Sequence, residues 1–115
     1  SNLKNTATTI KVWDMHLNQF VVANKKCGIL MGDYSRCAIN TSFNTGTVIG
    51  ICANIFDSYG LTPKFFPNFA WGINEKYKIE KALQDIQNWM EFKNKTLSEP
   101  QKNILTELYY TNKTL

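Results

Sequence analysis

Residues 31–60 decide the fold that this sequence predicts, and they read MGDYSRCAINTSFNTGTVIGICANIFDSYG. Their apolar residues recur with a period of six, which is neither the period of a helix nor that of an alternating strand. The positions one and four places after each apolar residue are mostly small residues or asparagine. The apolar residues at this spacing are Met31, Cys37, Phe43, Ile49 and Ile55.

A six-residue repeat of this kind is typical of parallel β-helices. The apolar side chain fills the interior, and glycine or asparagine allows the backbone to bend sharply at each corner. Residues 31–60 would make fewer turns than the roughly three repeats that a solenoid needs. We therefore expect a mainly β fold, a left-handed parallel β-helix, whose remaining coils lie upstream or in partner chains.

The residues on either side of the repeat predict other elements. Two β-favouring pieces at 9–13 and 19–22 flank a polar segment, and this pattern predicts a hairpin. The predicted segments are a loop and hairpin excursion of the β-helix (1–28), hexapeptide-repeat coils (29–60), an aromatic exit loop (61–74) and a two-helix C-terminal cap (75–115).

The C-terminal segment predicts an α-helical hairpin. Between residues 75 and 95, Ile79, Leu83 and Trp89 share one apolar stripe with three other residues, and charged residues occupy the opposite face. A second helix is predicted to begin at Ser98, which forms a capping box with Gln101. We expect the two helices to pack over the end of the β-helix and to cover its last coil.

The composition indicates one domain of 115 residues with 43% hydrophobic residues. The net charge of +4 is mild and Arg36 is the only arginine, so nucleic acid is not expected as a partner. The sequence has no run of ~20 apolar residues, so a membrane is not expected as a partner either. Three cysteines match no zinc pattern, and free thiols suit a reducing cytosol, so we expect a cytoplasmic protein without a metal site in this sequence. Because the sequence begins without methionine or a signal peptide, we interpret it as a piece of a larger protein.

Residues 27–50, 53–56 and 63–72 resemble the C-terminal half of GlmU-like sugar-phosphate nucleotidyltransferases, which are similar to the bifunctional enzyme that makes UDP-N-acetylglucosamine. The motifs that carry the resemblance are Met-Gly-Asp at 31–33 and Asn-Thr-Gly-Thr-Val-Ile-Gly at 44–50. The resemblance implies a homotrimeric left-handed β-helix that binds acetyl-CoA or another acyl-CoA and a sugar phosphate or nucleotide sugar. The family's nucleotidyltransferase domain, with its Mg²⁺, lies outside this sequence.

The resemblance implies roles for few residues of this chain. Asn2 corresponds to the asparagine of a substrate-binding loop, although Leu3 replaces the tyrosine that follows it in the family. Lys11 falls near a basic residue of the same loop and would face a phosphate. The catalytic histidine of the family lies on a coil that this sequence does not contain, so the catalytic residues stay unknown. The residues of the implied acyl-CoA groove are Asn40, Asn44 and Thr45.

Other reactive residues have plainer interpretations. His16, the only histidine, lies at the tip of the predicted hairpin, where a solvated turn residue is the simpler account of it. Cys37 takes an inward position of the repeat and is expected to be an inert small hydrophobic residue. Asn40, Asn44 and Asp33 are residue types that β-helix corners select without any ligand.

Two functions fit these observations. The first is the acyltransferase-type β-helix segment of a sugar-nucleotide-forming transferase. The second is a trimerising or regulatory scaffold, without catalysis of its own, for a nucleotidyltransferase domain. The sequence does not decide whether this part of the chain is an enzyme.

Overall fold

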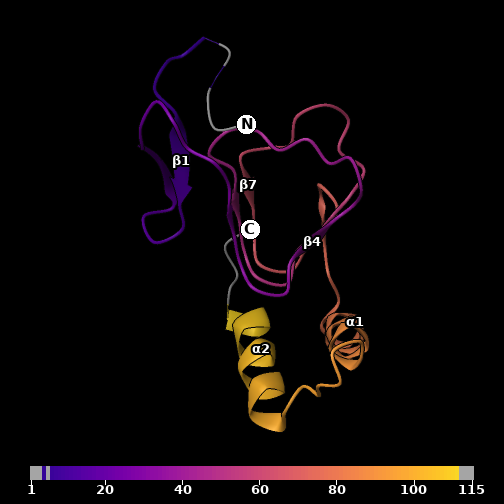
Figure 1. Ribbon diagram of the computed structural model, residues 1–115. Helices are drawn as coiled ribbons and strands as arrows, with labels where there is room; N and C mark the ends of the chain where they lie inside the picture. The colour runs from indigo at the N-terminus through magenta and orange to yellow at the C-terminus, as the bar shows by residue number, and fades with distance from the viewer. Residues whose placement is uncertain (1–3, 5, 112–115) are drawn as a thin grey trace.

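The computed structural model describes residue 4 and residues 6–111 of the chain (Figure 1). Within these residues, the strands form three small sheets and two helices follow them. The strands are β1 (Lys11–Asp14), β2 (Gln19–Val22), β3 (Leu30–Met31), β4 (Arg36–Cys37), β5 (Val48–Ile49), β6 (Asn54–Ile55), β7 (Phe65–Phe66), β8 (Ala70–Trp71) and β9 (Glu75–Lys76). The helices are α1 (Ile79–Glu91) and α2 (Glu99–Thr111).

The chain passes three times through two of these sheets. The first pass supplies β3 and β4, the second supplies β5 and β6, and the third supplies β7 and β8. Successive passes pair in parallel: Leu30 pairs with Val48, and Val48 pairs with Phe65. The other sheet repeats this register from Arg36 to Asn54. Because the register is the same in both sheets, equivalent residues of the three passes lie above one another.

The prediction of a left-handed parallel β-helix is wrong. Within the described residues the parallel strands are two residues long, they belong to two separate small sheets, and they do not close into a solenoid. Outside these sheets, an isolated parallel bridge joins Ser42 and Leu61. The last strand, β9, pairs with β8 in the antiparallel sense. Two-residue strands form few ladder hydrogen bonds, so the six-residue period positions short strands without specifying a closed coil.

The core between the two sheets comes from the second and third passes. It contains a cluster of five buried apolar residues, and half-buried Phe43 packs against them. The largest of them, Phe66, is 1% exposed. Burial of these side chains holds the two sheets together, because the ladder hydrogen bonds run within each sheet and not between the two sheets. The cluster consists of Ile49, Ala53, Ile55, Phe66 and Ala70.

Each pass bends sharply between its two strands. Tyr34, Cys52 and Phe69 occupy equivalent positions in the three bends, and each has a positive φ, of 60°, 55° and 60°. Non-glycine residues adopt this left-handed conformation at a cost of about 1–2 kcal/mol. Tertiary packing sustains it here, because Cys52 and Phe69 are buried in the cluster beneath the helices and Tyr34 packs against that cluster.

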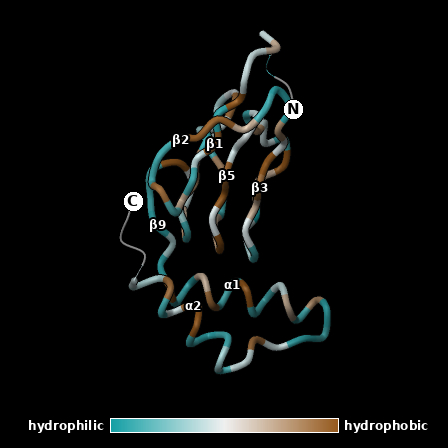
Figure 2. The backbone as a smooth tube through the Cα atoms, turned by 90° about the vertical axis from the view of Figure 1, so that its left-hand side faces the viewer, coloured by the Kyte–Doolittle hydropathy of each residue, from teal (hydrophilic) through white to brown (hydrophobic). Residues whose placement is uncertain are grey.

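The sequence predicts that the helices cover the last coil of the β-helix. Instead, they lie along the bends of the three passes. Both helices lie together at one end of the sheets (Figures 1 and 2). The cluster that joins them to the bends contains Ala82 and Ile86 of α1, Leu105 of α2, and Cys52 and Phe69 of the bends. The positive-φ residues turn their side chains toward this end, and this explains why the helices pack there.

The ends of the helices follow local signals in the sequence. Helix α2 begins where predicted: the Gln101 backbone N–H donates to Ser98 Oγ (3.3 Å), and the Ser98 backbone N–H donates to Gln101 Oε1 (2.9 Å). Helix α1 is shorter at both ends than the predicted span of 75–95, and at its start β9 occupies Glu75–Lys76. In the described part of the chain, neither helix is long and apolar enough to cross a membrane.

The predicted N-terminal hairpin is confirmed. Strands β1 and β2 pair in the antiparallel sense, with Asp14 opposite Gln19. The Asp14 carboxylate closes the turn by accepting the backbone N–H groups of His16 (2.8 Å) and Leu17 (3.0 Å). Trp13 stacks on Phe65 with 5.0 Å between ring centroids. The hairpin therefore packs beside β7 through aromatic side chains.

Candidate functional site

The first pass ends both parallel sheets without a neighbour on its outer side among the described residues. The backbone N–H groups of Leu30 and Gly32 donate to the second pass at 2.9 Å, and those of Arg36 and Ala38 do so at 2.8 Å. Since alternate amides of a strand point to opposite sides, the intervening N–H groups, of Met31 and Cys37, point away from the second pass. We call this edge of β3 and β4 the open end.

The side chains of the open end are exposed where their equivalents in the other passes are buried. Met31 is 41% exposed, whereas its register partners Ile49 and Phe66 are 2% and 1% exposed. Cys37 is exposed, and its partner Ile55 is fully buried. Strand β3 lies at the outer edge of its sheet and is hydrophobic (Figure 2). The open end therefore presents inward-type residues to its surroundings.

Two of the residues that the sequence analysis assigns to ligands lie near each other. Lys11 is exposed on β1, and its carbonyl oxygen accepts a hydrogen bond from Lys64 Nζ at 2.8 Å. Partial burial, and then the nearby Lys4, lower the pKa of the Lys64 ammonium. Gly46 packs closely against the same carbonyl, next to Thr45. Thr45 is 4% exposed, and its hydroxyl has no partner within the described residues.

The other assigned residues have structural roles or lie outside the described residues. Asn2 belongs to the part of the chain that is not described. Asn40 is an exposed turn residue with a φ of 66°, which asparagine tolerates well. The Asn44 backbone N–H donates to the Thr62 hydroxyl at 3.2 Å. Their part in an acyl-CoA groove stays a prediction of the family resemblance.

The cysteines differ in environment, and one prediction about them is wrong. Cys37 is exposed and not buried, although it is in register with buried Ile55, because it belongs to the first pass and no described strand covers it. Cys52 is 1% exposed in the second bend. Its burial, and then the charge of Asp33, raise the pKa of the Cys52 thiol to about 12. Only the thiolate reacts with electrophiles.

Alkylation of the folded protein is expected to separate these two thiols. With iodoacetamide at pH 8, Cys37 should react readily, while Cys52 reacts slower by on the order of a hundredfold or more. Peptide mass spectrometry over a time course measures both rates. In urea the two rates should become similar, which controls for local sequence. Equal rates in the folded protein would contradict the buried position of Cys52.

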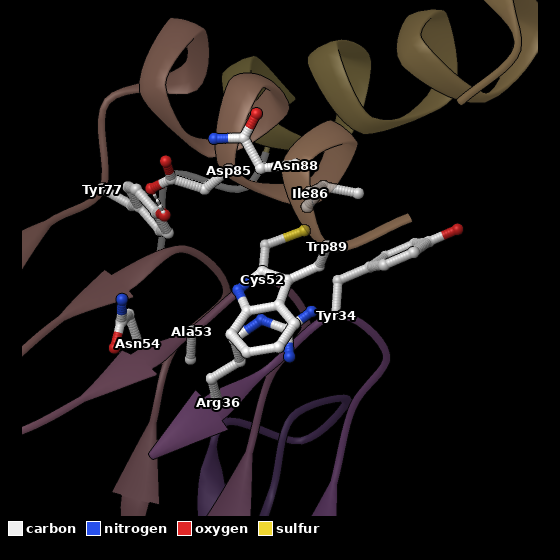
Figure 3. A pocket seen from close by; sticks show the side chains of 10 residues that line it. All are labelled: Tyr34, Arg36, Cys52, Ala53, Asn54, Tyr77, Asp85, Ile86, Asn88 and Trp89. Carbon is white, nitrogen blue, oxygen red and sulfur yellow. Dashed lines mark hydrogen bonds between the residues drawn. The ribbon is translucent and has the colours of Figure 1, made fainter. Parts of the chain in front are cut away.

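A cavity of about 100 Å³ lies between the sheet of β4 and β6 and helix α1 (Figure 3). Arg36 of β4 lines it, and its guanidinium carbon lies 3.9 Å from the ring centroid of Trp89 on α1. Partial burial lowers the pKa of Arg36. The buried side of the cavity is formed by Cys52, Ala53 and Ile86.

Polar groups of the same cavity are already engaged with one another. The Tyr77 hydroxyl donates a hydrogen bond to the Asp85 carboxylate, and Lys81 lies 3.3 Å from the other oxygen of that carboxylate. Burial, and then the bond to Asp85, raise the pKa of Tyr77 above its ordinary value. Tyr77 therefore acts as a neutral hydrogen-bond donor to Asp85 here.

No pattern in the sequence indicates this cavity. The sequence predicts Trp89 in the apolar stripe of the first helix, whereas Trp89 is 48% exposed and lies over Arg36. The one usable signal was that Arg36 is the only arginine among 13 basic residues. Its partner lies 53 positions later in the chain, so no local pattern joins the two residues.

Comparison of the chain with protein-family models, with curated proteins and with solved structures finds no match.

Proposed function

We propose that this chain is an assembly module without catalysis of its own, and that its open end pairs with the open end of a second copy. One observation carries the proposal: Met31 and Cys37 are exposed in the first pass, while their register partners Ile49 and Ile55 are buried.

The physical argument starts from the unpaired backbone of the edge. Edge strands with free N–H and C=O groups are templates for further pairing, and proteins usually protect them with charged residues, proline or a bulge. Strand β3 is only two residues long, but it carries no charge, proline or bulge and exposes two apolar side chains, Leu30 and Met31. Pairing of two identical edges gives a two-fold dimer, because the same surface serves both partners. The implied homotrimer would have to use another face.

Sedimentation velocity on two matched glutamate substitutions tests this role. Leu30 on the open end and Ile104 on α2 are similarly exposed, at 60% and 58%. The unmodified chain and Ile104→Glu should sediment as dimers at micromolar concentration, whereas Leu30→Glu should be monomeric because its carboxylate would be buried without a partner. Circular dichroism confirms that each variant is folded. A folded, monomeric parent chain would refute the assembly role, as would a Leu30→Glu dimer of parent-like affinity.

A further inference from the structure

The guanidinium of Arg36 is held in one orientation. It stacks on Trp89 at 3.9 Å, and the close view shows the indole ring lying over it (Figure 3). A stacked guanidinium uses its face for the aromatic ring and keeps its N–H donors in the plane. Those donors are therefore available along the edge of the group, which is the geometry that binds two oxygens of one anion.

The same guanidinium lacks a counter-ion. No hydrogen bond or ion pair joins it to another residue in the described ranges 4 and 6–111, although partial burial already disfavours its charged form. A partly buried charge is ordinarily paired with an opposite charge. The one carboxylate that lines the cavity, Asp85, is engaged by the Tyr77 hydroxyl and the Lys81 ammonium. The protein thus balances the charge of Asp85 and leaves that of Arg36.

The remaining lining complements a small polar ligand. Asn54 comes from β6 and Asn88 from α1, and both side chains line the cavity that Arg36 also lines (Figure 3). Side-chain amides donate through nitrogen to anionic oxygens. The cavity of about 100 Å³ suits one phosphate or carboxylate group with few further atoms, and not an extended chain.

We propose that this cavity is an oxyanion site, in which Arg36, oriented by Trp89, binds the phosphate or carboxylate group of a small molecule. Asn54, which is in register with Arg36, binds a remaining oxygen, and Asn88 lies at the exposed side of the cavity, where its Oδ1 accepts from Gln84 Nε2 at 3.0 Å. The ligand contacts of the site come from a single chain, although Arg36 belongs to β4, which is also a strand of the open end.

Titration of the folded chain with inorganic phosphate, and separately with acetate, at constant ionic strength tests the site. The side-chain N–H resonances of Arg36 and Trp89 should shift and saturate. Arg36→Lys keeps the charge and loses the two-point geometry, so its affinity should fall at least tenfold. Lys102→Gln removes a positive charge from α2, where Lys102 lies 3.4 Å from Glu99, and should stay within twofold of the parent.

A second variant keeps the test valid if Arg36→Lys does not fold. Asn88 is exposed on α1, so Asn88→Asp should fold normally, and its carboxylate should also weaken anion binding at least tenfold. Tighter binding of phosphate would identify a phosphate ester as the ligand class, and tighter binding of acetate would identify a carboxylate; both results support the site. Absence of saturable shifts with either anion would overturn it, and so would parent-like affinity in the folded variants.

Discussion

Replacement of Phe66 with alanine is expected to lower the free energy of unfolding by about 3–5 kcal/mol. Phe66 is the largest side chain of the cluster between the two parallel sheets, and it is 1% exposed. Its removal leaves a cavity between Ile49 and Ile55, which two-residue strands cannot close by shifting without losing their few ladder hydrogen bonds. Urea unfolding followed by circular dichroism measures this loss.

Phe92 provides a matched control for this substitution. It is 81% exposed beyond the end of α1 and touches Trp89 through a tilted ring contact. Phe92→Ala should therefore change the free energy of unfolding by less than about 1 kcal/mol. A Phe66→Ala protein as stable as Phe92→Ala would show that the two sheets do not share this core.

The second large effect is expected at Gly50, which follows β5. A methyl group there would lie 2.5 Å from the backbone nitrogen of Asn68 and 2.8 Å from its Cα. Backbone atoms cannot yield as a flexible side chain does, so the second and third passes would have to separate. The bond from the Ile51 N–H to Asn68 Oδ1 (2.9 Å) would be disturbed as well. We expect Gly50→Ala to cost about 3 kcal/mol of stability.

Gly28 is the control for this glycine. A methyl group there would meet no atom within 4 Å, and its φ is not in the left-handed region. Gly28→Ala should leave the protein as stable as the parent or raise its stability by about 0.4–1 kcal/mol, because alanine restricts the unfolded chain. Thermal unfolding of both variants compares them directly. Equal melting temperatures for Gly50→Ala and Gly28→Ala would contradict the close approach of the passes.

Local features of this fold could be predicted from the sequence. The hairpin follows from two β-favouring pieces and from Asp14, which caps its own turn. The start of α2 follows from Ser98 and Gln101, whose hydrogen bonds form within four residues of each other. In each case the residues that decide the structure are neighbours in the chain.

Features that depend on distant residues could not be predicted in this way. The six-residue period places Met31 and Ile49 in strands. Whether the strands close into a solenoid depends on how many passes cover one another, and this number cannot be predicted from the period. Cys37 occupies an inward position of the six-residue repeat, but it is exposed because β4 is the edge strand of its sheet. The Arg36–Trp89 contact forms only in the folded chain, where α1 packs near β4.

Amide hydrogen exchange at Met31 and Cys37 tests most directly whether the open end is covered in the assembled protein. Their N–H groups point away from the second pass, so exchange should be fast in the Leu30→Glu monomer. In the parent chain, exchange at both amides should slow by at least ~tenfold as the protein concentration rises through the range of association. Rates at these two amides that do not change with concentration would contradict pairing at the open end.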